Sequence, residues 1–332
     1  MQPVTVAVAG GLGNQLFQLA AAAYAAGATG RGIELCFRMS DRSALRRAFV
    51  HVRAAVRRAV ADRDGGFRVD AMERRPEIVS IQSLAPPTNV ADDHRRGLTR
   101  RRLKSVFRNR GSIESVLALR TPSDVRGFAE GGRDLAADIL PLIAGNMQTE
   151  ELVDPVLGLL RSSLRLPLET PRCQRWLPEL RHPNVVGVHV RRGDYTKAAY
   201  RDVFTLLAPE WYGQAAEVIR SRAGSDARFA VFTDDPAWVK SRLRLPGRSV
   251  MVSGDAPPSA TEDLSLLSAC HHHIIANSTF SWWGARLSTR GGLTVYPPNW
   301  FMRDRTPVEL FPPGWIGVPN PASRNEGRHE RQ

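Results

Sequence analysis

Two short apolar segments that run directly into polar residues constrain this chain most strongly. VVGVHV at 185–190 leads into Arg191 and Arg192, and HHHIIA at 271–276 leads into the polar run at 277–279. Short apolar runs bounded by turn residues are typical of buried strands in a parallel sheet. Ligands of open α/β sheets bind beyond the carboxyl ends of the strands, so we expect both polar tips to face one crevice.

The residues at the second tip suit an anionic group such as a diphosphate. Asn277, Ser278 and Thr279 precede Phe280 and two tryptophans at the predicted start of a helix. Helix N-termini offer free N–H groups to phosphates, and hydroxyl groups add further donors. Ordinary helix capping is the alternative, but it does not explain several hydroxyls around three aromatic residues.

The first tip supplies positive charge. Consecutive strand residues point to opposite faces, so only one of the two arginines is expected to reach the ligand. His189 shares a face with Arg191, which favours Arg191, and Asp194 is placed to orient an arginine through a charge-assisted pair. The alternative is a surface salt bridge at the end of a strand.

A third strand tip carries carboxylates. RFAVFT at 228–233 ends in Thr233 and is followed by Asp234, Asp235 and Pro236. Asp235 is predicted to cap a helix that begins at the proline, which leaves Asp234 at the strand tip. A carboxylate is the natural acceptor for the N–H edge of guanine, so Asp234 is the candidate contact to the base. The alternative is that both aspartates only cap a turn.

A glycine turn follows the first predicted strand. The run at 4–9 leads into GGLGNQ at 10–15 and then into a helix expected over 16–26. Leu16 stands where a dinucleotide fingerprint has its third glycine, so a simple strand-to-helix turn is the alternative. Glycines still let the backbone approach a ligand closely, and the side-chain amides add polar reach. The candidate contacts here are Gly11, Gly13, Asn14 and Gln15.

Strand and helix alternate regularly through the second half, which predicts a doubly wound parallel sheet and an α/β fold. In the first half, helices are expected near 112–118 and 132–142. The proline-bearing stretch at 150–181 is interpreted as the crossing between halves. The predicted domains are 1–180, with an Arg-rich insertion at 42–110, and 181–322, followed by a disordered tail at 323–332.

The net charge of +13 is concentrated in one block. Residues 42–110 hold 17 Arg and 1 Lys against 7 Asp and Glu. Apolar residues recur at helical spacing over 41–60, so this segment is expected to form a basic amphipathic helix, either packed on the first domain or lying against an anionic membrane. A nucleic-acid-binding protein is the remote alternative, because no recognised module accompanies the block and it contains only three phenylalanines.

The remaining composition indicates a cytoplasmic protein. Three scattered cysteines without metal-ligand or redox spacing favour a reducing compartment. No segment has the length of a spanning helix or the charged start of a signal peptide. The three consecutive histidines at 271–273 would alternate faces in a strand and are interpreted as structural, so no metal is predicted.

Four blocks of the chain together resemble the α-1,2-fucosyltransferase family, glycosyltransferase family 11, of bacterial type. They are GGLGNQLFQLA, HVRRGDY, VFTDD and DLSLLSACHHHIIANSTFSWWGARL. The resemblance is poor between Arg42 and Leu180. It implies a GT-B-like fold, with two Rossmann-like domains facing a cleft, the first on the acceptor side and the second binding the nucleotide-sugar. It also implies metal-independent, inverting transfer of fucose from GDP-fucose to the 2-hydroxyl of a galactoside in a surface or secreted glycan, with no cofactor.

The resemblance also implies roles for the candidate residues. Arg191 would neutralise the β-phosphate as GDP departs, supported by His189. Inverting transfer usually uses a carboxylate as the base, and Asp194 is one candidate for it. The alternatives are an acidic residue of the first half, or a cation-like sugar in the transition state that needs little base. Donor contacts would come from Gly11, Gly13, Asn14, Gln15, Arg192, Thr233, Asp234, Asn277, Ser278, Thr279 and Phe280. Another GDP-sugar or deoxysugar nucleotide is the alternative donor. The expected partners are a GDP-sugar and a glycan or lipid-linked oligosaccharide acceptor, with peripheral membrane contact and no nucleic acid.

Overall fold

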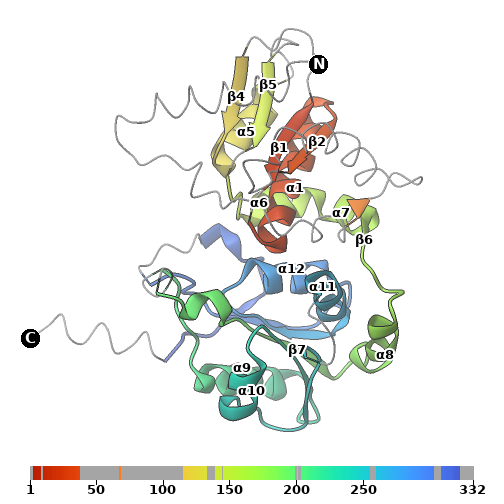
Figure 1. The fold of residues 1–332 in the computed structure, drawn as a ribbon, viewed down its shortest axis with the longest axis vertical. Coiled ribbons are helices and arrows are strands. Elements are labelled where there is room, and N and C mark those ends of the chain that lie inside the picture. The colour runs from red at the N-terminus through yellow and green to blue at the C-terminus, as the bar shows by residue number, and fades with distance from the viewer. Residues whose placement is uncertain are drawn as a thin grey trace, which may run out of the picture. The chain divides into compact units, whose positions relative to one another are not determined.

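The computed structural model describes residues 3–8, 10–37, 67–68, 115–132, 139–143, 145–198, 200, 203–254, 259–302 and 308–321. The chain divides into two compact units, Met1–Arg165 and Leu166–Gln332 (Figure 1). Each contains a parallel sheet with packed helices. The prediction of an α/β fold with two units, each built on a parallel sheet, is confirmed. The GT-B arrangement of the two units stays a prediction. The Arg-rich insertion, apart from two residues, and the tail at 323–332 lie outside the described residues.

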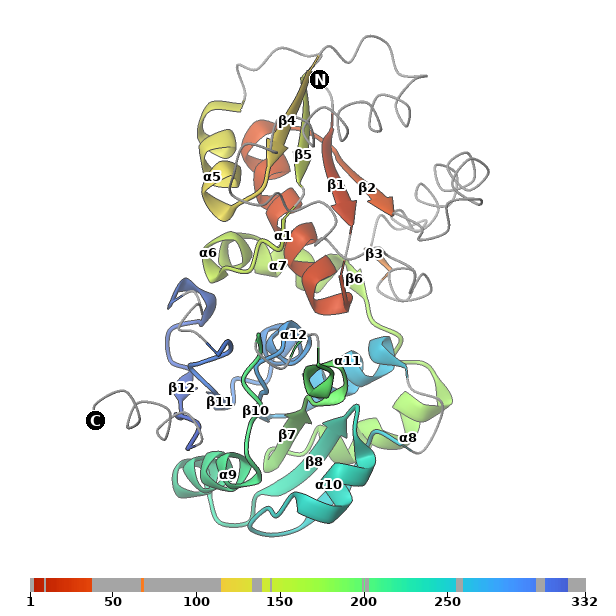
Figure 2. The same ribbon diagram turned by 60° about the vertical axis from the view of Figure 1, so that its left-hand side comes forward.

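The first unit is built around a four-stranded sheet in the order β2-β1-β5-β4, in which every pairing is parallel (Figure 2). A two-stranded parallel pair, β3-β6, accompanies it. The elements are β1 (Val4–Val8), α1 (Leu12–Thr29), β2 (Ile33–Phe37), β3 (Phe67–Arg68), β4 (Ser115–Leu119), α5 (Pro122–Gly131), β5 (Ile139–Ile143), α6 (Glu150–Val153), η3 (Asp154–Val156), α7 (Leu157–Ser163) and β6 (Leu164–Arg165).

Two predicted helices of the first half are wrong. Residues 115–119 form strand β4, and the end of the helix expected over 132–142 lies in strand β5, while residues 133–138 lie outside the described residues. The helix of this region is α5, which begins earlier because Thr121 accepts a hydrogen bond from the backbone of Asp124 while the Asp124 carboxylate accepts one from Thr121. This capping box is a local signal for the start of a helix, and a prediction based on hydrophobic periodicity does not use it.

Helix α1 is longer than the predicted 16–26 and is buried almost all round. Its alanine-rich middle allows close packing on the sheet, and α5 and α6 pack against it as well. The helix ends where Gly30 adopts a left-handed conformation, with φ of 68°, a form that glycine tolerates without strain.

The second unit contains a six-stranded parallel sheet in the order β12-β11-β10-β7-β8-β9. The strands and helices predicted for this half are present, with small shifts in their bounds. The elements are α8 (Pro171–Leu180), β7 (Val185–Val190), η4 (Gly193–Thr196), α9 (Pro209–Ala223), β8 (Arg228–Thr233), α10 (Pro236–Arg242), β9 (Ser249–Met251), α11 (Ala260–Ala269), β10 (His272–Ile274), α12 (Thr279–Leu287), β11 (Thr294–Tyr296), η5 (Val308–Leu310) and β12 (Ile316–Gly317).

Helices cover both faces of this sheet. On one face α9 and α10 bury Trp211, Tyr212 and Val239 against β7, β8, β10 and β11. On the other, α8 and α11 pack Trp176 and Leu267 against β7 and β8 (Figures 1 and 2). Because α8 belongs to this core, the division between units falls after Arg165, whereas the sequence placed it after residue 180.

Side-chain caps begin two helices of the second unit, and the cap at Asp235 confirms the prediction from the sequence. The Asp235 carboxylate accepts a hydrogen bond from the backbone of Trp238 at the start of α10. The Ser259 hydroxyl accepts one from the backbone of Glu262 at the start of α11. None of the helices in the described ranges combines the length and the hydropathy that crossing a bilayer requires.

Leu267 packs in a narrow space between strand β7 and helix α12. A Cβ on Gly187 would lie 2.7 Å from Leu267 Cδ1, and one on Gly284 would lie 2.5 Å from Leu267 Cδ2. Leu267 is fully buried, so it has little room to move. Close packing here fixes the distance between the central strand and the helix whose N-terminus follows β10.

Replacing Gly284 with alanine should therefore destabilise the second unit by about 1–3 kcal/mol through overpacking. Gly213→Ala in α9 is the matched control, because its added Cβ would make only an ordinary contact at 3.7 Å and alanine favours a helix. Urea unfolding of both variants measures the free energies. Equal stability of Gly284→Ala and the wild type would contradict the packing described.

Candidate active site

The topology of the second sheet places a switch point beside strand β7. From β7 the chain proceeds through β8 and β9 in one direction, and then returns to β10 on the opposite side of β7. The connections therefore leave the carboxyl ends of β7 and β10 in opposite directions, which is the switch point where open parallel sheets bind ligands. The arginines after β7 and the polar run after β10 both lie at this point.

The register of β7 and β8 brings Arg191 to Asp234. Val190 pairs with Thr233 at the last position of the two strands, so the next residue on each strand lies at the same edge. Arg191 Nη1 is 2.6 Å from Asp234 Oδ2, and Arg191 Nη2 is 3.6 Å from Asp194 Oδ2. The Arg191 side chain remains 32% exposed, so it is held by carboxylates and still accessible to a ligand.

Arg192 is directed elsewhere. Its Nε atom is 3.3 Å from Asp235 Oδ2, and its guanidinium lies 4.2 Å from the centre of the Trp238 ring on α10. The two adjacent arginines therefore point in different directions, as strand geometry predicts. Arg191 pairs with Asp234, and Arg192 pairs with Asp235. Contact of Arg192 with a nucleotide stays a prediction.

Both carboxylate oxygens of Asp234, the predicted contact to guanine, contact other groups of the protein. Its Oδ2 binds Arg191, and its Oδ1 accepts the backbone N–H of Arg192 at 2.8 Å. A Cβ on Gly193 would lie 2.6 Å from Asp234 Oδ2, so the glycine permits this close approach. In the structure Asp234 organises the loop after β7. Thr233 similarly serves the turn, since its hydroxyl accepts the backbone N–H of Asp235 at 3.0 Å.

His189 lies beneath this corner as a neutral side chain. It is 6% exposed, and its ring centre lies 5.2 Å from that of Phe280 in the first turn of α12. Burial lowers the pKa of His189 to about 3, with Asp234 opposing and Arg191 adding to the shift. Its Nδ1 atom has no hydrogen-bond partner among the described residues. His189 therefore links the end of β7 to the start of α12 through an uncharged ring contact.

The N-terminus of α12 presents free donors. Ser278 is the cap residue, but its side chain makes no capping hydrogen bond, and the first turn contains no acidic residue. Thr279 and Phe280 are partly exposed, and the first N–H groups of the helix lack intrahelical partners. These features suit an anion, as the sequence predicted.

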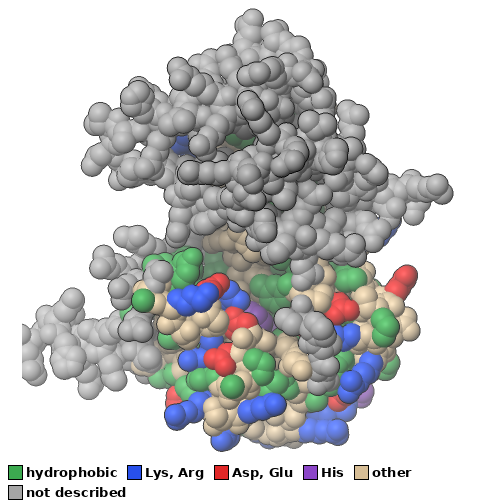
Figure 3. Space-filling view, in the orientation of Figure 1, with side chains coloured by type: hydrophobic (Ala, Val, Ile, Leu, Met, Phe, Trp, Pro, Cys, Tyr) green, Lys and Arg blue, Asp and Glu red, His purple; other side chains and the backbone are tan. Residues whose placement is uncertain are grey.

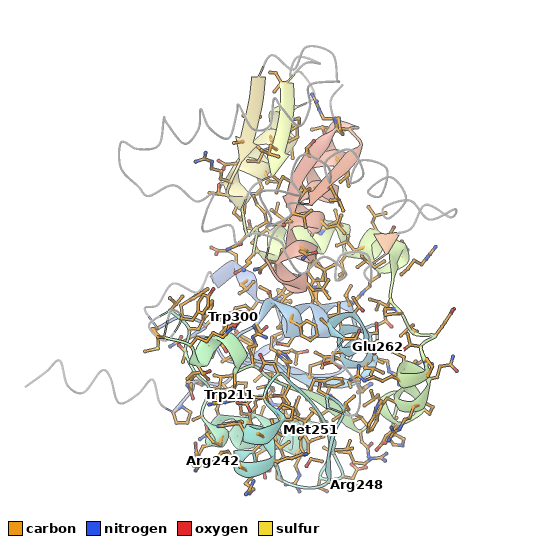
Figure 4. All side chains as sticks on the ribbon, viewed as in Figure 1. Trp211, Arg242, Arg248, Met251, Glu262 and Trp300 are labelled. Atoms are coloured by element: carbon orange, nitrogen blue, oxygen red, sulfur yellow. The ribbon has the colours of Figure 1, made fainter. Side chains whose placement is uncertain are left out.

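Asn277 has a different role from the one predicted. It is 1% exposed, and its side-chain NH2 group donates to the backbone carbonyls of Thr205 at 2.8 Å and Trp300 at 2.9 Å. Both N–H groups are therefore used to hold two loops, the second of which contains Trp300 (Figure 4). Only the Oδ1 atom of Asn277 is left without a partner.

Tyr195 is a site residue that sequence reasoning missed. It is buried, its hydroxyl donates to the carbonyl of Asn277 at 2.8 Å, and the Arg191 guanidinium lies 5.5 Å from the centre of its ring. Burial raises its pKa to about 12, so it remains a protonated donor. Tyr195 thus joins the arginine tip to the start of α12. Its place directly after Arg-Arg-Gly-Asp was the signal available.

Asp194 is fixed as a carboxylate. Lys197 donates a hydrogen bond to it, which is the largest cause of its lowered pKa, with Arg191 contributing as well. A base with a lowered pKa has little affinity for a proton, so Asp194 is poorly suited to deprotonate an acceptor.

On the face of the second unit drawn in Figure 3, basic and acidic side chains are interspersed.

The predicted contacts of the first unit lie at the turn between β1 and α1. Gly10, which the sequence analysis did not select, needs the glycine freedom, with φ of 79°. Gly11 caps α1 and is exposed, while Gly13 is buried in its first turn. Gln15 Nε2 donates to the Gly10 carbonyl at 2.9 Å, and Asn14 Oδ1 accepts from Gln148 Nε2 at 2.9 Å. Gln148 was not predicted.

Within the described ranges, no group of three or more His, Cys, Asp or Glu side chains could hold a metal ion. The two buried histidines of β10 serve the backbone. His272 Nδ1 accepts the N–H of Leu293 at 2.9 Å, and His273 Nε2 lies 3.0 Å from the Leu267 carbonyl.

Comparison with known proteins points to the same region. Residues 173–319, which lie within the second unit, match the family model Glycosyl transferase family 11. Galactoside 2-alpha-L-fucosyltransferase SEC1 of Bos taurus is 36% identical over 40% of this chain and 38% of that protein. The resemblance to the α-1,2-fucosyltransferase family is confirmed for residues 173–319.

Two proteins of Escherichia coli are similarly related. O-antigen biosynthesis glycosyltransferase WbnK is 33% identical over 41% of this chain and 45% of that protein. Alpha-1,2-colitosyltransferase is 33% identical over 42% of this chain and 49% of that protein. The chain thus aligns with less than half the length of each of these curated relatives.

Among solved structures, the fucosyltransferase NodZ from Bradyrhizobium is 18% identical, with a TM-score of 0.44 over 86% of this chain and 92% of that chain. This similarity is too low to indicate the activity of this chain.

The buried histidines predict a loss of stability in acid. An unfolded histidine has a pKa near 6.5, whereas His189 titrates at about 3 and His273 at about 4 in the folded chain. The unfolded state therefore binds more protons below about pH 6.5. The stabilisation from each neutral histidine is fully present above that pH and is lost as the pH falls toward the folded pKa.

Urea unfolding at pH 7, 6 and 5 should show a decrease on the order of 1 kcal/mol per pH unit for each such histidine. In His189→Gln the pH dependence of the unfolding free energy should decrease by an amount that corresponds to roughly one proton fewer taken up on unfolding. His182→Gln, at an exposed position, is the control and should keep the wild-type slope. An unchanged slope in His189→Gln would show that His189 is not buried in its neutral form.

Proposed function

We propose that this chain is an inverting, metal-independent glycosyltransferase that moves L-fucose from GDP-fucose to the 2-hydroxyl of a galactoside. The observation that carries the proposal is the Arg191 guanidinium at the sheet switch point, held by Asp234 and linked through Tyr195 to the N-terminus of α12. The family match and the names of the relatives support the sugar and the linkage. The O-antigen role in the name of WbnK supports a surface or secreted glycan as the product.

The chemistry of these residues is directed at the leaving group. As the glycosidic bond to GDP breaks, negative charge develops on the diphosphate. A fixed guanidinium and uncapped helix N–H groups stabilise that charge without having to reorganise during the reaction. Asp234 and Tyr195 restrict the Arg191 side chain, and the neutral His189 packs against Phe280 without adding a competing charge.

The acceptor side of the reaction belongs to the first unit in this proposal. Asn14 at the β1–α1 turn is partly exposed and would contact the acceptor sugar through its side-chain amide, whereas the buried Gln15 would hold the turn through the Gly10 carbonyl. Asp194 would orient Arg191 rather than act as the base, because its carboxylate is already stabilised by Lys197. We further propose a cytoplasmic enzyme that meets a glycan or lipid-linked acceptor at the inner face of a membrane, where the basic block at 42–110 would contact anionic lipid.

Arg191→Lys tests the proposal. Lysine keeps the charge but loses the planar guanidinium that can contact Asp234 and a phosphate at once, so kcat should fall by about 10²- to 10³-fold. Transfer from GDP-fucose to a β-galactoside is measured, with linkage analysis of the product. Arg220→Lys, which changes an arginine of α9 that contacts Glu217 and the Ser225 carbonyl, should keep wild-type turnover. Wild-type turnover by Arg191→Lys, or no transfer by the wild type across a broad acceptor panel, would refute the proposal.

A second donor deserves a direct comparison, because one relative is named as a colitosyltransferase. Calorimetric titration with GDP, GDP-fucose, GDP-colitose and GDP-mannose separates the nucleotide contribution from the sugar contribution. Under the proposal GDP and GDP-fucose bind, and GDP-fucose gives the highest kcat/KM. A higher kcat/KM for GDP-colitose would make the alternative donor correct while leaving the diphosphate site unchanged.

A further inference from the structure

A side-chain amide pair joins two loops at the carboxyl edge of the first sheet. Gln148 Nε2 donates to Asn14 Oδ1 at 2.9 Å, although the two residues lie 134 positions apart. Asn14 follows β1 and Gln148 follows β5, and these strands are direct neighbours, with Val6 paired to Ile143 (Figure 2). Both side chains are partly exposed, so the pair lies where a ligand can reach it.

The loop that carries Gln148 is held in a costly conformation. Met147 has φ of 53°, a left-handed form that a residue with a side chain adopts only at a cost on the order of 1 kcal/mol. The buried amide of Gln18 donates to the Gly145 carbonyl at 3.0 Å. A Cβ on Gly145 would lie 2.0 Å from the Arg120 carbonyl oxygen, so only glycine fits there. These constraints fix the backbone on both sides of residue 146.

The turn that carries Asn14 is equally specific. Gly10 has φ of 79°, and a Cβ on it would lie 2.9 Å from Asn14 Nδ2. With Oδ1 engaged by Gln148, the NH2 group of Asn14 lies beside Gly10 and has no hydrogen-bond partner in the described part of the chain. It stands next to the N-terminus of α1, where the Gly11 cap leaves the first N–H groups free and no acidic side chain competes.

Stability does not explain this arrangement. A partly exposed amide–amide hydrogen bond contributes only about 1 kcal/mol, which the left-handed Met147 alone offsets. Strained backbone that orients a partly exposed polar side chain is characteristic of functional positions. The result of the strain is one defined orientation of the Asn14 amide, with its donors directed toward the α1 N-terminus.

We propose that Gln148 is a positioning residue of the transfer reaction. It fixes the Asn14 amide so that its NH2 group, together with the first N–H groups of α1, donates to a substrate oxygen at the carboxyl edge of the first sheet. This inference rests on the proposed function. Gln148 acts through Asn14 and needs no contact with substrate.

Gln148→Glu is the sharpest variant, because it preserves size and removes the donor. A carboxylate at 148 accepts a hydrogen bond, so the Asn14 amide turns its NH2 group toward it and presents Oδ1 to the ligand instead. Misplacement of one contact near the reacting atoms costs about 10²-fold, and we expect kcat to fall by that factor. Gln174→Glu, the same change at an exposed position on α8, is the matched control and should leave kcat unchanged.

Kinetics in both substrates and thermal melting separate positioning from a structural role. Asn14→Ala should lose at least as much activity as Gln148→Glu, and the double variant Asn14→Ala with Gln148→Glu should be no worse than Asn14→Ala alone. A raised KM for the acceptor would identify the sugar hydroxyl as the oxygen, and a raised KM for GDP-fucose would identify the donor. Wild-type kcat in Gln148→Glu, or additive losses in the double variant, would overturn the proposal.

A spectroscopic measurement tests the geometry without turnover. In ¹⁵N–¹H spectra the Asn14 NH2 pair, assigned by its absence in Asn14→Asp, should move on Gln148→Glu as its N–H gains a carboxylate acceptor, and should not move on Gln174→Glu. An unmoved signal overturns the proposal even if kcat falls. A wild-type protein that transfers no sugar overturns the proposed function and this inference with it, whereas an active wild type with an unaffected Gln148→Glu variant overturns this inference alone.

Discussion

The ion pair between Arg191 and Asp234 is the contact on which the candidate site depends. Asp234 accepts from the Arg191 guanidinium with one oxygen and from the Arg192 backbone with the other, so one carboxylate sets both the arginine and the loop that leaves β7. Gly193 makes room for that carboxylate. The loop then brings Tyr195 to the Asn277 carbonyl, which connects the ion pair to the start of α12.

Charge around this corner is balanced rather than strongly positive. Arg191, Arg192 and Lys197 are each paired with an aspartate. A partly exposed ion pair is worth little in stability, because water screens it. The ion pair matters here because it fixes the Arg191 side chain, so that little conformational entropy is lost when an anion binds. Under the proposed function, the attraction for a diphosphate would come from the N–H groups at the α12 N-terminus and from the exposed part of the Arg191 side chain.

The position of the site follows from the order of the strands. Strand β7 is buried along its whole length and lies in the middle of the sheet, with β8 on one side and β10 on the other. Its tip therefore has two neighbouring tips, one carrying carboxylates and the other a helix N-terminus. A polar side chain within that strand has to be neutral to be buried, which is the state that His189 adopts.

The sequence by itself determined the elements whose signals are local. The buried strands of the second unit, the Asp235 and Ser259 caps, the glycine turn after β1 and the separation of two adjacent arginines all follow from residues a few positions apart. Tertiary structure decided the rest. Strands β4 and β5 form because each pairs with the other, the Asn277 amide is used by loops at Thr205 and Trp300, and Gln148 reaches Asn14 across two strands. Each of these depends on contacts between residues far apart in the chain, and a pattern of near neighbours carries no information about them.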